Sequence, residues 1–284
     1  MSPELTEKYQ NLRAEIRSYE SALVALSGGI DSSLVAYVAV KELGDKALAI
    51  TSGSESLKAA DLQLAKEITG EWGMNHRVIK TREIENADYV KNPINRCYFC
   101  KSTLYSGLKK IAEREGFKWV LNGTNTDDLG DYRPGLTAAD ENAVKSPLQS
   151  CGFAKQDVRD LADHLKLRNA KKPAAACLSS RVPYGTAISS DLLQRIEQAE
   201  LVLEKLGLAQ FRVRHHGSIA RLEVEVADFP VIIDKRLEIE TQFKQLGYSY
   251  VTLDLKGFRS GSLNEAISVP EPDQAERKKG IQHA

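Results

Sequence analysis

The chain is poor in cysteine, methionine and tryptophan, with four, two and two residues among 284. It also lacks any run of about 18 apolar residues, which a membrane-spanning helix needs. Its first stretch, MSPELTEKYQNLRAEIRSYE, lacks the apolar core of a signal peptide. We therefore expect a cytoplasmic protein with no membrane partner. Cysteines stay reduced in that compartment, so these four are ligands, catalysts or buried thiols before they are disulfides.

The chain also has no excess of positive or negative charge. Lys+Arg and Asp+Glu both number 39, so the formal net charge is zero. No net field therefore attracts a nucleic-acid backbone or an anionic membrane surface. Nucleic acid is not an expected partner.

Short apolar runs alternate with helical patterns over the first two thirds of the chain. We expect strands in four stretches, SALVALSGG, KALAITSGS, NHRVIKT and KWVLNGTN, each preceded or followed by a helical pattern. This order predicts an α/β fold with a doubly wound, mostly parallel sheet. Ligands of such sheets bind beyond the carboxyl ends of the strands.

The pattern changes past residue 185. A helical stretch, SSDLLQRIEQAELVLEKLG, precedes three stretches that alternate like half-buried antiparallel strands, namely FRVRHH, ARLEVEV and YVTLDLKGF. The sequence thus predicts a larger domain over residues 1–184, a small α+β domain over 185–268 and a polar tail over 269–284.

The stretch SGGIDSS lies between an expected strand and an expected helix. Gly28 and Gly29 allow a tight turn whose N–H groups face an anion at the helix N-terminus, and Ser27 and Ser32 add hydroxyl donors. Asp31 suits such a site only beside a cation, which we assign to Mg²⁺ carried by a nucleotide. The alternative is a plain Gly-rich turn with a capping aspartate. A Walker loop is excluded because its G-x-x-x-x-G-K-[ST] pattern is missing.

Two of the cysteines lie close together, as Cys97 and Cys100 in INRCYFCKS. Such a pair is a redox pair, half of a zinc site, part of an iron–sulfur site, or two buried thiols. A third thiol follows as Cys177 in ACLSSR. Three thiolates can hold a cluster with one open iron, or a zinc ion with one open position. We interpret Cys151, in QSCGFAK, as structural.

Arg212 and Arg214 alternate along an expected strand, so both point to one face. Two guanidinium forks on one face suit a monoester phosphate. The alternative is a solvent-facing strand with surface salt bridges. Glu200 lies at the edge of the apolar stripe of its helix, either as an ordinary boundary residue or as an active-site carboxylate.

SGGIDSS resembles the pyrophosphate loop of the ATP pyrophosphatase superfamily, which has the adenine nucleotide alpha hydrolase-like fold. Two further stretches, NGTNTDDLGDYRPG and ACLSSRVPYG, narrow the resemblance together with RVRHH and YVTLDLKGFRSG. They resemble the LarE family, ATP-dependent sulfurtransferases that mature the nickel-pincer nucleotide cofactor. The resemblance spans residues 15–265 of the chain.

The resemblance implies a substrate, pyridinium-3,5-biscarboxylic acid mononucleotide. ATP would adenylate a carboxylate with release of pyrophosphate, and sulfur from sulfide or another donor would displace AMP to leave a thiocarboxylate. It also implies a symmetric homo-oligomer, with a hexamer among the options.

The family implies two sources of sulfur. In some members a cysteine gives up its own sulfur, and as aligned here that cysteine falls on Ala176, one residue before Cys177. Other members hold a [4Fe-4S] cluster with three cysteines. The one-residue shift favours the cluster on Cys97, Cys100 and Cys177, with zinc as the fallback and sacrifice of Cys177 as the alternative.

The remaining site residues are likewise implied by the resemblance. The ATP-binding residues are Ser27, Gly28, Gly29, Asp31, Ser32, Ser52, Asn125, Asp127 and Arg133. The residues for sulfur transfer, besides the three cysteines, are Arg181 and Glu200. Those for the substrate phosphate are Ser180, Arg212, Arg214 and Arg259. Asp127 can equally be a turn or capping residue, Arg133 a loop anchor, and Lys101 either a phosphate ligand or an exposed side chain.

Two other functions remain open from the sequence. A tRNA-thiolating enzyme would use the same loop and a cysteine-held cluster, but the zero net charge and the lack of an RNA-binding stripe speak against it. A non-catalytic ATP-binding metal carrier would release no pyrophosphate.

Overall fold

The structure, a computed structural model, describes residues 1–130, 134–173, 176–259 and 261–266. Its contacts divide the chain into two compact units, Met1–Leu201 and Val202–Ala284. This division falls within helix α9 (Ser190–Lys205), whereas the predicted boundary at residue 184 precedes that helix. Arg133 and the predicted tail over 269–284 lie outside the described residues.

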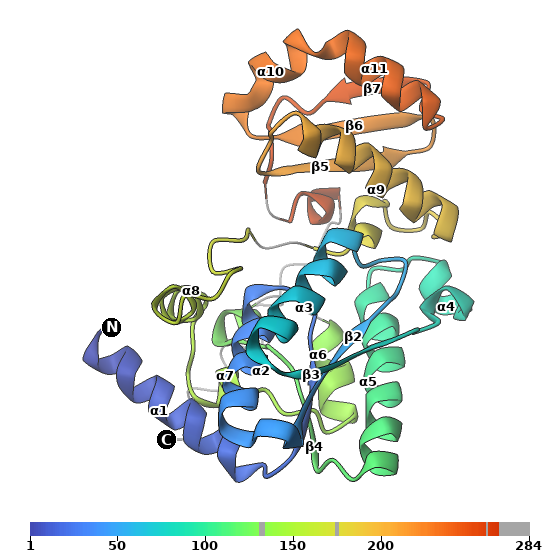
Figure 1. Ribbon diagram of the computed structural model, residues 1–284. Coiled ribbons are helices and arrows are strands. Elements are labelled where there is room, and N and C mark those ends of the chain that lie inside the picture. The colour runs from blue at the N-terminus through green and yellow to red at the C-terminus, as the bar shows by residue number, and fades with distance from the viewer. Residues whose placement is uncertain (131–133, 174–175, 260, 267–284) are drawn as a thin grey trace, which may run out of the picture. The chain divides into compact units, whose positions relative to one another are not determined.

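In the described part of the first unit, four parallel strands form one sheet in the order β3–β2–β1–β4 (Figure 1). The strands are β1 (Ala22–Ala25), β2 (Ala47–Ser52), β3 (Asn75–Ile79) and β4 (Trp119–Leu121). Each lies in one of the four stretches expected above to form strands. The predicted parallel α/β fold is confirmed.

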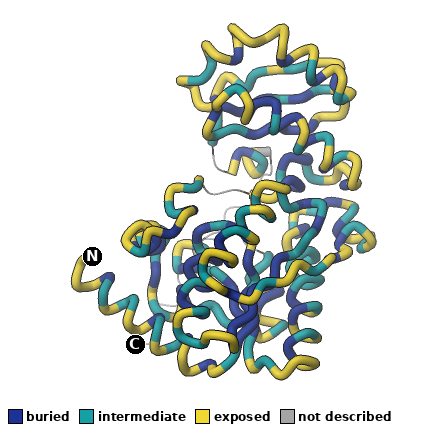
Figure 2. The backbone as a smooth tube through the Cα atoms, viewed as in Figure 1, coloured by how far each residue is buried: buried dark blue, intermediate teal, exposed yellow. Residues whose placement is uncertain are grey.

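Helices cover this sheet on both faces, as the alternation of side chains along β1 requires. Ala22 and Val24 belong to one hydrophobic cluster, and Leu23 belongs to another. The first cluster includes residues of α1 (Pro3–Ser18), α2 (Ile30–Leu43), α3 (Ala59–Trp72), α7 (Pro147–Ser150) and α8 (Lys155–His164). The second includes residues of α5 (Arg96–Glu115) and α6 (Pro134–Glu141). The tube view shows the buried centre of this unit (Figure 2).

The strand order reverses at β1, because β2 and β3 lie on one side of it and β4 on the other. Open α/β sheets bind ligands at such a switch point. The loops that follow β1 and β4 therefore meet where a ligand is expected. A Cβ atom at Gly123 would lie 2.5 Å from the backbone nitrogen of Ser32, so glycine is needed for this close approach.

The second unit contains a three-stranded sheet in the order β5 (Phe211–His216), β6 (Ile219–Val224) and β7 (Tyr250–Leu253). β5 and β6 are antiparallel, but β7 runs parallel to β6. The prediction of three antiparallel strands is therefore wrong for β7. The physical reason is the connection, since helices α10 (Phe229–Asp234) and α11 (Arg236–Gln245) form a crossover of the kind that parallel strands need.

Helix α5 carries the C-x-x-C pair. Its first residue is Arg96, so the CYFC stretch forms its first turn. A short helix, α4 (Ala87–Val90), precedes it. Among the described residues, no helix is long and apolar enough to cross a membrane.

Candidate active site

The phosphate loop turns at Gly28, whose φ of +76° favours glycine. Gly29 instead has an ordinary φ of −77° and caps α2 at its N-terminus. The Ser27 and Ser32 hydroxyls lie 3.1 Å apart, and the Ser32 hydroxyl donates to the carbonyl oxygen of Gly29 at 3.1 Å. The loop thus presents two hydroxyls and a helix N-terminus, a setting that suits a phosphate.

Asp31 is held by two side chains from distant segments. Asn125 donates its amide Nδ2 to one carboxylate oxygen at 3.1 Å, and Lys155 donates its Nζ to the other at 2.5 Å. An internal ammonium thus neutralises the carboxylate. A divalent cation at Asp31 would have to displace that ammonium. Sequence reasoning missed Lys155, whose only signal is its place at the start of a helix.

Other predicted ATP residues lie at the same edge of the sheet. Asn125 is buried, and its Oδ1 accepts the backbone N–H of Asp127 at 3.0 Å. The Asp127 carboxylate accepts the backbone N–H of Lys155 at 2.9 Å, as the capping alternative predicts. Ser52 ends β2, and its hydroxyl contacts that of Thr81.

The segment after α8 supports the phosphate loop from behind. The Asn169 amide donates to the carbonyl oxygen of Gly28 at 3.1 Å and to the hydroxyl of Ser33 at 2.8 Å. Lys172 pairs with Asp61 and lies 3.5 Å from the same Gly28 oxygen. Neither residue was predicted, because neither belongs to a motif.

Three cysteines share one neighbourhood. Cys97 and Cys100 are three residues apart in the first turn of α5, so they lie on the same side of that helix. Cys177 is exposed and precedes a short 3₁₀ turn, Leu178–Arg181. Leu178 of this turn is fully buried in a cluster that Cys100 also contacts. The fold therefore brings the third thiol to the other two.

The thiols influence one another electrostatically. Cys97 is exposed as a residue, but the protein atoms around its thiol raise the pKa of that thiol. The nearby Cys177 raises the pKa of Cys97 further, and the Arg96 guanidinium lowers it. Burial raises the pKa of Cys100 to about 12. Arg96 is buried and donates to the carbonyl oxygen of Ser179 at 2.9 Å. Sequence reasoning missed this arginine beside the C-x-x-C pair.

The donor set suits a soft metal or an iron–sulfur cluster. In the described ranges, however, no three His, Cys, Asp or Glu side chains lie close enough together to hold a metal ion. The thiols share a neighbourhood without converging on one point. Lys101, next to Cys100, lies over the ring of Tyr105 at 5.8 Å from its centroid.

Glu200 and Arg181 form a buried ion pair, each side chain only 3% exposed. Arg181 donates Nε to one carboxylate oxygen at 2.8 Å and a terminal nitrogen to the other at 3.2 Å. Lys58 approaches the second oxygen at 2.5 Å. Burial alone would raise the pKa of Glu200, but Arg181 and Lys58 lower it below its usual range. Glu200 is therefore a charged carboxylate.

Arg181 also binds the main chain beside the cysteine. Its other terminal nitrogen, Nη1, donates to the carbonyl oxygen of Ala176 at 2.7 Å and to that of Cys177 at 3.2 Å. The same nitrogen lies 3.0 Å from the hydroxyl of Ser180.

Arg212 and Arg214 of the second unit are buried rather than solvent-facing, whereas Arg259 is partly exposed. Arg212 is 8% exposed and lies over the ring of Phe258, 4.8 Å from its centroid. Arg214 is 1% exposed and donates to Glu223 at 2.9 Å. Arg259 donates to Asp254 at 3.3 Å. The alternative of a solvent-facing strand is therefore wrong. Ser180 belongs to the first unit and these arginines to the second.

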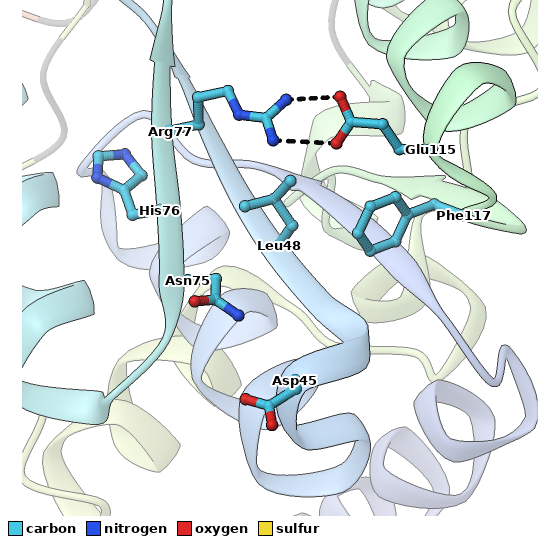
Figure 3. Close-up of a pocket in the computed structure, with 7 residues that line it drawn as sticks. All are labelled: Asp45, Leu48, Asn75, His76, Arg77, Glu115 and Phe117. Atoms are coloured by element: carbon cyan, nitrogen blue, oxygen red, sulfur yellow. Dashed lines mark hydrogen bonds and ion pairs between the residues drawn. The ribbon is translucent and has the colours of Figure 1, made fainter.

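A hollow of about 340 Å³ lies near the amino ends of β2 and β3, at the edge of the sheet opposite to the phosphate loop. Figure 3 shows the residues that line it. Arg77 in it donates two hydrogen bonds to Glu115, at 2.8 and 2.9 Å. This bidentate pair already uses the guanidinium, so the hollow does not offer it to an anion. The lining residues are Asp45, Leu48, Asn75, His76, Arg77, Glu115 and Phe117.

Known proteins with similar sequences include several synthases. The family described as asparagine synthase matches residues 10–177. The chain is 39% identical to the pyridinium-3,5-bisthiocarboxylic acid mononucleotide synthase of Lactiplantibacillus plantarum, over 93% of this chain and 96% of that one. It is 43% identical to an uncharacterized protein of Synechocystis sp., over 93% of this chain and 99% of that one. One subunit of the glutamine-hydrolyzing GMP synthase of Archaeoglobus fulgidus is 23% identical, over 80% of this chain and 74% of that one.

Proposed function

Because the chain belongs to the asparagine synthase family of the ATP pyrophosphatase superfamily and, more narrowly, to the LarE family, we propose an ATP-dependent sulfur transfer as its function. The proposed acceptor is pyridinium-3,5-biscarboxylic acid mononucleotide. The observation that carries the proposal is a 2.9 Å hydrogen bond from the backbone N–H of Leu178 to the carbonyl oxygen of Ser56. It holds the segment that follows Cys177 against the connection after β2, at the edge of the sheet where ligands of such folds bind.

The proposed chemistry has two steps at each carboxylate. A carboxylate oxygen of the substrate attacks the α-phosphorus of ATP, and the bond to pyrophosphate breaks. Sulfide then attacks the activated carbonyl carbon, and the bond to AMP breaks to leave a thiocarboxylate. One ATP and one sulfide are consumed for each sulfur inserted, and the product is a precursor of the nickel-pincer nucleotide cofactor.

We assign the first step to the loops at the switch point. The backbone of Gly28 and Gly29, with the hydroxyls of Ser27 and Ser32, would bind the phosphates. Asp31 would hold Mg²⁺ after its ammonium partner moves away, and that ammonium would then be free to meet a phosphate oxygen. The further proposed ATP contacts are Ser52, Asn125, Asp127 and Arg133.

For the second step we propose that Cys97, Cys100 and Cys177 hold a [4Fe-4S] cluster. Held by three thiolates, such a cluster leaves one iron open to carry exogenous sulfide. Each of the three thiolates would then bind a different iron, so the thiols would have to be neighbours rather than ligands of one atom. Zinc is the fallback, and it would need its sulfur ligands at about 2.3 Å from one point. Sacrifice of Cys177 remains the alternative sulfur source.

We propose Ser180, Arg212, Arg214 and Arg259 as contacts for the substrate phosphate. Arginine suits a phosphate because its planar fork donates two parallel hydrogen bonds. Arg214 already donates to Glu223 and to Ser262 at 2.6 Å, so its contribution includes holding that buried carboxylate. A homo-oligomer, with a hexamer among the options, also remains part of the proposal.

One experiment separates these functions. The protein is purified anaerobically and analysed for iron and acid-labile sulfide, and pyrophosphate release is measured with and without the mononucleotide. We expect about four irons per chain, lost in Cys97→Ala, and release only with the mononucleotide. Loss of H₂S from Cys177 after turnover, without iron, would establish the sacrificial route instead. Tight tRNA binding that weakens with salt would support the tRNA-thiolating alternative. If no pyrophosphate is released under any condition, the result would support the alternative of a non-catalytic ATP-binding metal carrier.

A further inference from the structure

The connection between β2 and α3, together with the first turn of α3, touches both functional loops of the first unit. On one side, the carbonyl oxygen of Asp61 lies so close to Gly28 that a Cβ atom there would be 2.7 Å away. On the other side, the carbonyl oxygen of Ser56 accepts the backbone N–H of Leu178 at 2.9 Å. The connection and the first turn of α3 together are therefore packed between the phosphate loop and the segment that carries Cys177.

Lys58 is the charged residue of this connection that reaches the sulfur side. Its side chain is 22% exposed, and its ammonium lies 2.5 Å from Glu200 Oε2. The next residue reinforces the contact, since the backbone N–H of Ala59 donates to Glu197 at 2.6 Å. Two carboxylates of α9 are thus bound at the start of α3.

A continuous chain of charged contacts leads from Lys58 to the cysteine. Glu200 binds Lys58 on one side and Arg181 on the other. Arg181 in turn donates to the carbonyl oxygens of Ala176 and Cys177, at 2.7 and 3.2 Å. These contacts fix the main chain at the third thiol. Charge-assisted hydrogen bonds are stronger and more directional than neutral ones, so each link resists displacement.

The number of donors around Glu200 also decides its role. Each of its carboxylate oxygens already accepts a hydrogen bond from Arg181, and Lys58 adds a third charged donor. A carboxylate enclosed in this way orients its cations and is poorly placed to accept a proton from a substrate.

We propose that Lys58 is a positioning residue for sulfur transfer: through Glu200 and Arg181 it holds the Cys177 main chain against the ATP-binding half of the unit. The inference rests on the proposed sulfur-transfer function. Because Lys58 follows directly on the loop after β2, it also gives the adenylation side a physical link to the sulfur side.

The test compares Lys58→Met, Lys58→Arg and a control, Lys91→Met, whose side chain is 71% exposed in the wild type. Two half-reactions are followed in each, isotope exchange between pyrophosphate and ATP with the mononucleotide present, and formation of the thiocarboxylate. We expect Lys58→Met to slow thiocarboxylate formation by about tenfold to a hundredfold, the scale of a misplacement near 1 Å. Exchange should change by less than about twofold, Lys58→Arg should recover most of the loss, and Lys91→Met should match the wild type.

A second measurement needs no substrate. Limited proteolysis at low protease should cleave the 176–181 segment several times faster in Lys58→Met than in the wild type, at equal thermal stability. Unchanged cleavage, or an equal fall of both half-reactions together with a lower melting temperature, would overturn the proposal. A wild-type protein that shows no exchange with the mononucleotide would refute the proposed function and leave the proteolysis result to decide on Lys58.

Discussion

The phosphate loop and the cysteine neighbourhood are built in opposite ways. Most hydrogen bonds of the phosphate loop are local, between Ser27, Gly29 and Ser32 within a single turn. The cysteine neighbourhood joins a turn of α5 to a segment far along the chain, and Arg181 and Glu200 hold that segment through tertiary contacts. The first site depends on backbone conformation and the second on a network of buried charges.

The largest expected effect breaks the phosphate-loop side of this comparison. Asp31→Asn keeps the shape of the side chain but removes the charge that would hold Mg²⁺. We expect pyrophosphate release to fall by about a hundredfold or more, the usual cost of losing a group that stabilises transition-state charge. The assay is mononucleotide-dependent pyrophosphate release. Asp45→Asn, at an exposed position, is the control; a release rate within about threefold of the wild type in Asp31→Asn would refute the assigned role.

The next effect separates the two sites from each other. Cys177→Ser should abolish thiocarboxylate formation, because an alcohol neither donates sulfur nor binds iron as a thiolate does. Isotope exchange between pyrophosphate and ATP, with the mononucleotide present, should remain, since it needs adenylation of the substrate but no sulfur. Cys151→Ser serves as the matched control, and mass spectrometry of the product is the measurement. Sulfur transfer equal to the wild type in Cys177→Ser would contradict our interpretation.

A smaller effect sharpens the dependence of the phosphate loop on its backbone. Gly28→Ala places a Cβ in a left-handed conformation, 2.7 Å from the Asp61 oxygen, and should lower the free energy of unfolding by about 1–3 kcal/mol. Gly29→Ala has an ordinary φ, and its new Cβ would lie 3.4 Å from the Ser27 hydroxyl, so it should cost a fraction of that. Urea unfolding of both variants gives the comparison. Equal destabilisation would show that φ at Gly28 is not the deciding factor.

The smallest expected effect concerns Cys151, the cysteine that does not belong to the group of Cys97, Cys100 and Cys177. Burial raises the pKa of Cys151 to about 12, and the nearby Glu15 carboxylate, 3.0 Å from its sulfur, raises it too. A raised pKa means that the folded state favours the protonated thiol. Its contribution to stability is therefore complete below the unfolded pKa of about 8.5 and is lost as the pH rises toward 12.

Glu15→Gln should weaken this effect. The pKa of Cys151 should fall, and alkylation of Cys151 by iodoacetamide near pH 9 should be a few times faster than in the wild type, because the thiolate is the nucleophile. Peptide mass spectrometry measures the rate. A rate that does not increase would leave burial as the sole cause.

The sequence predicted the parallel strands β1, β2 and β4 from continuous apolar runs, the usual pattern of a strand covered on both faces. β3 lies at the edge of the sheet, and its residues are largely polar and exposed or half-buried. It was wrong about the direction of β7, since the alternation of side chains is the same in parallel and antiparallel strands. Arg96, Lys58 and Lys155 escaped prediction because a single basic residue in a sequence does not reveal its partner.

Local chemistry is what the sequence determined by itself. SGGIDSS carries its own turn, its own hydroxyls and its own helix start, so its conformation follows from adjacent residues. The tertiary structure decided which distant groups meet: Lys155 with Asp31, Lys58 with Glu200, and Cys177 with the pair on α5. The physical reason is that a buried charge needs a partner, and only packing determines which charge that will be.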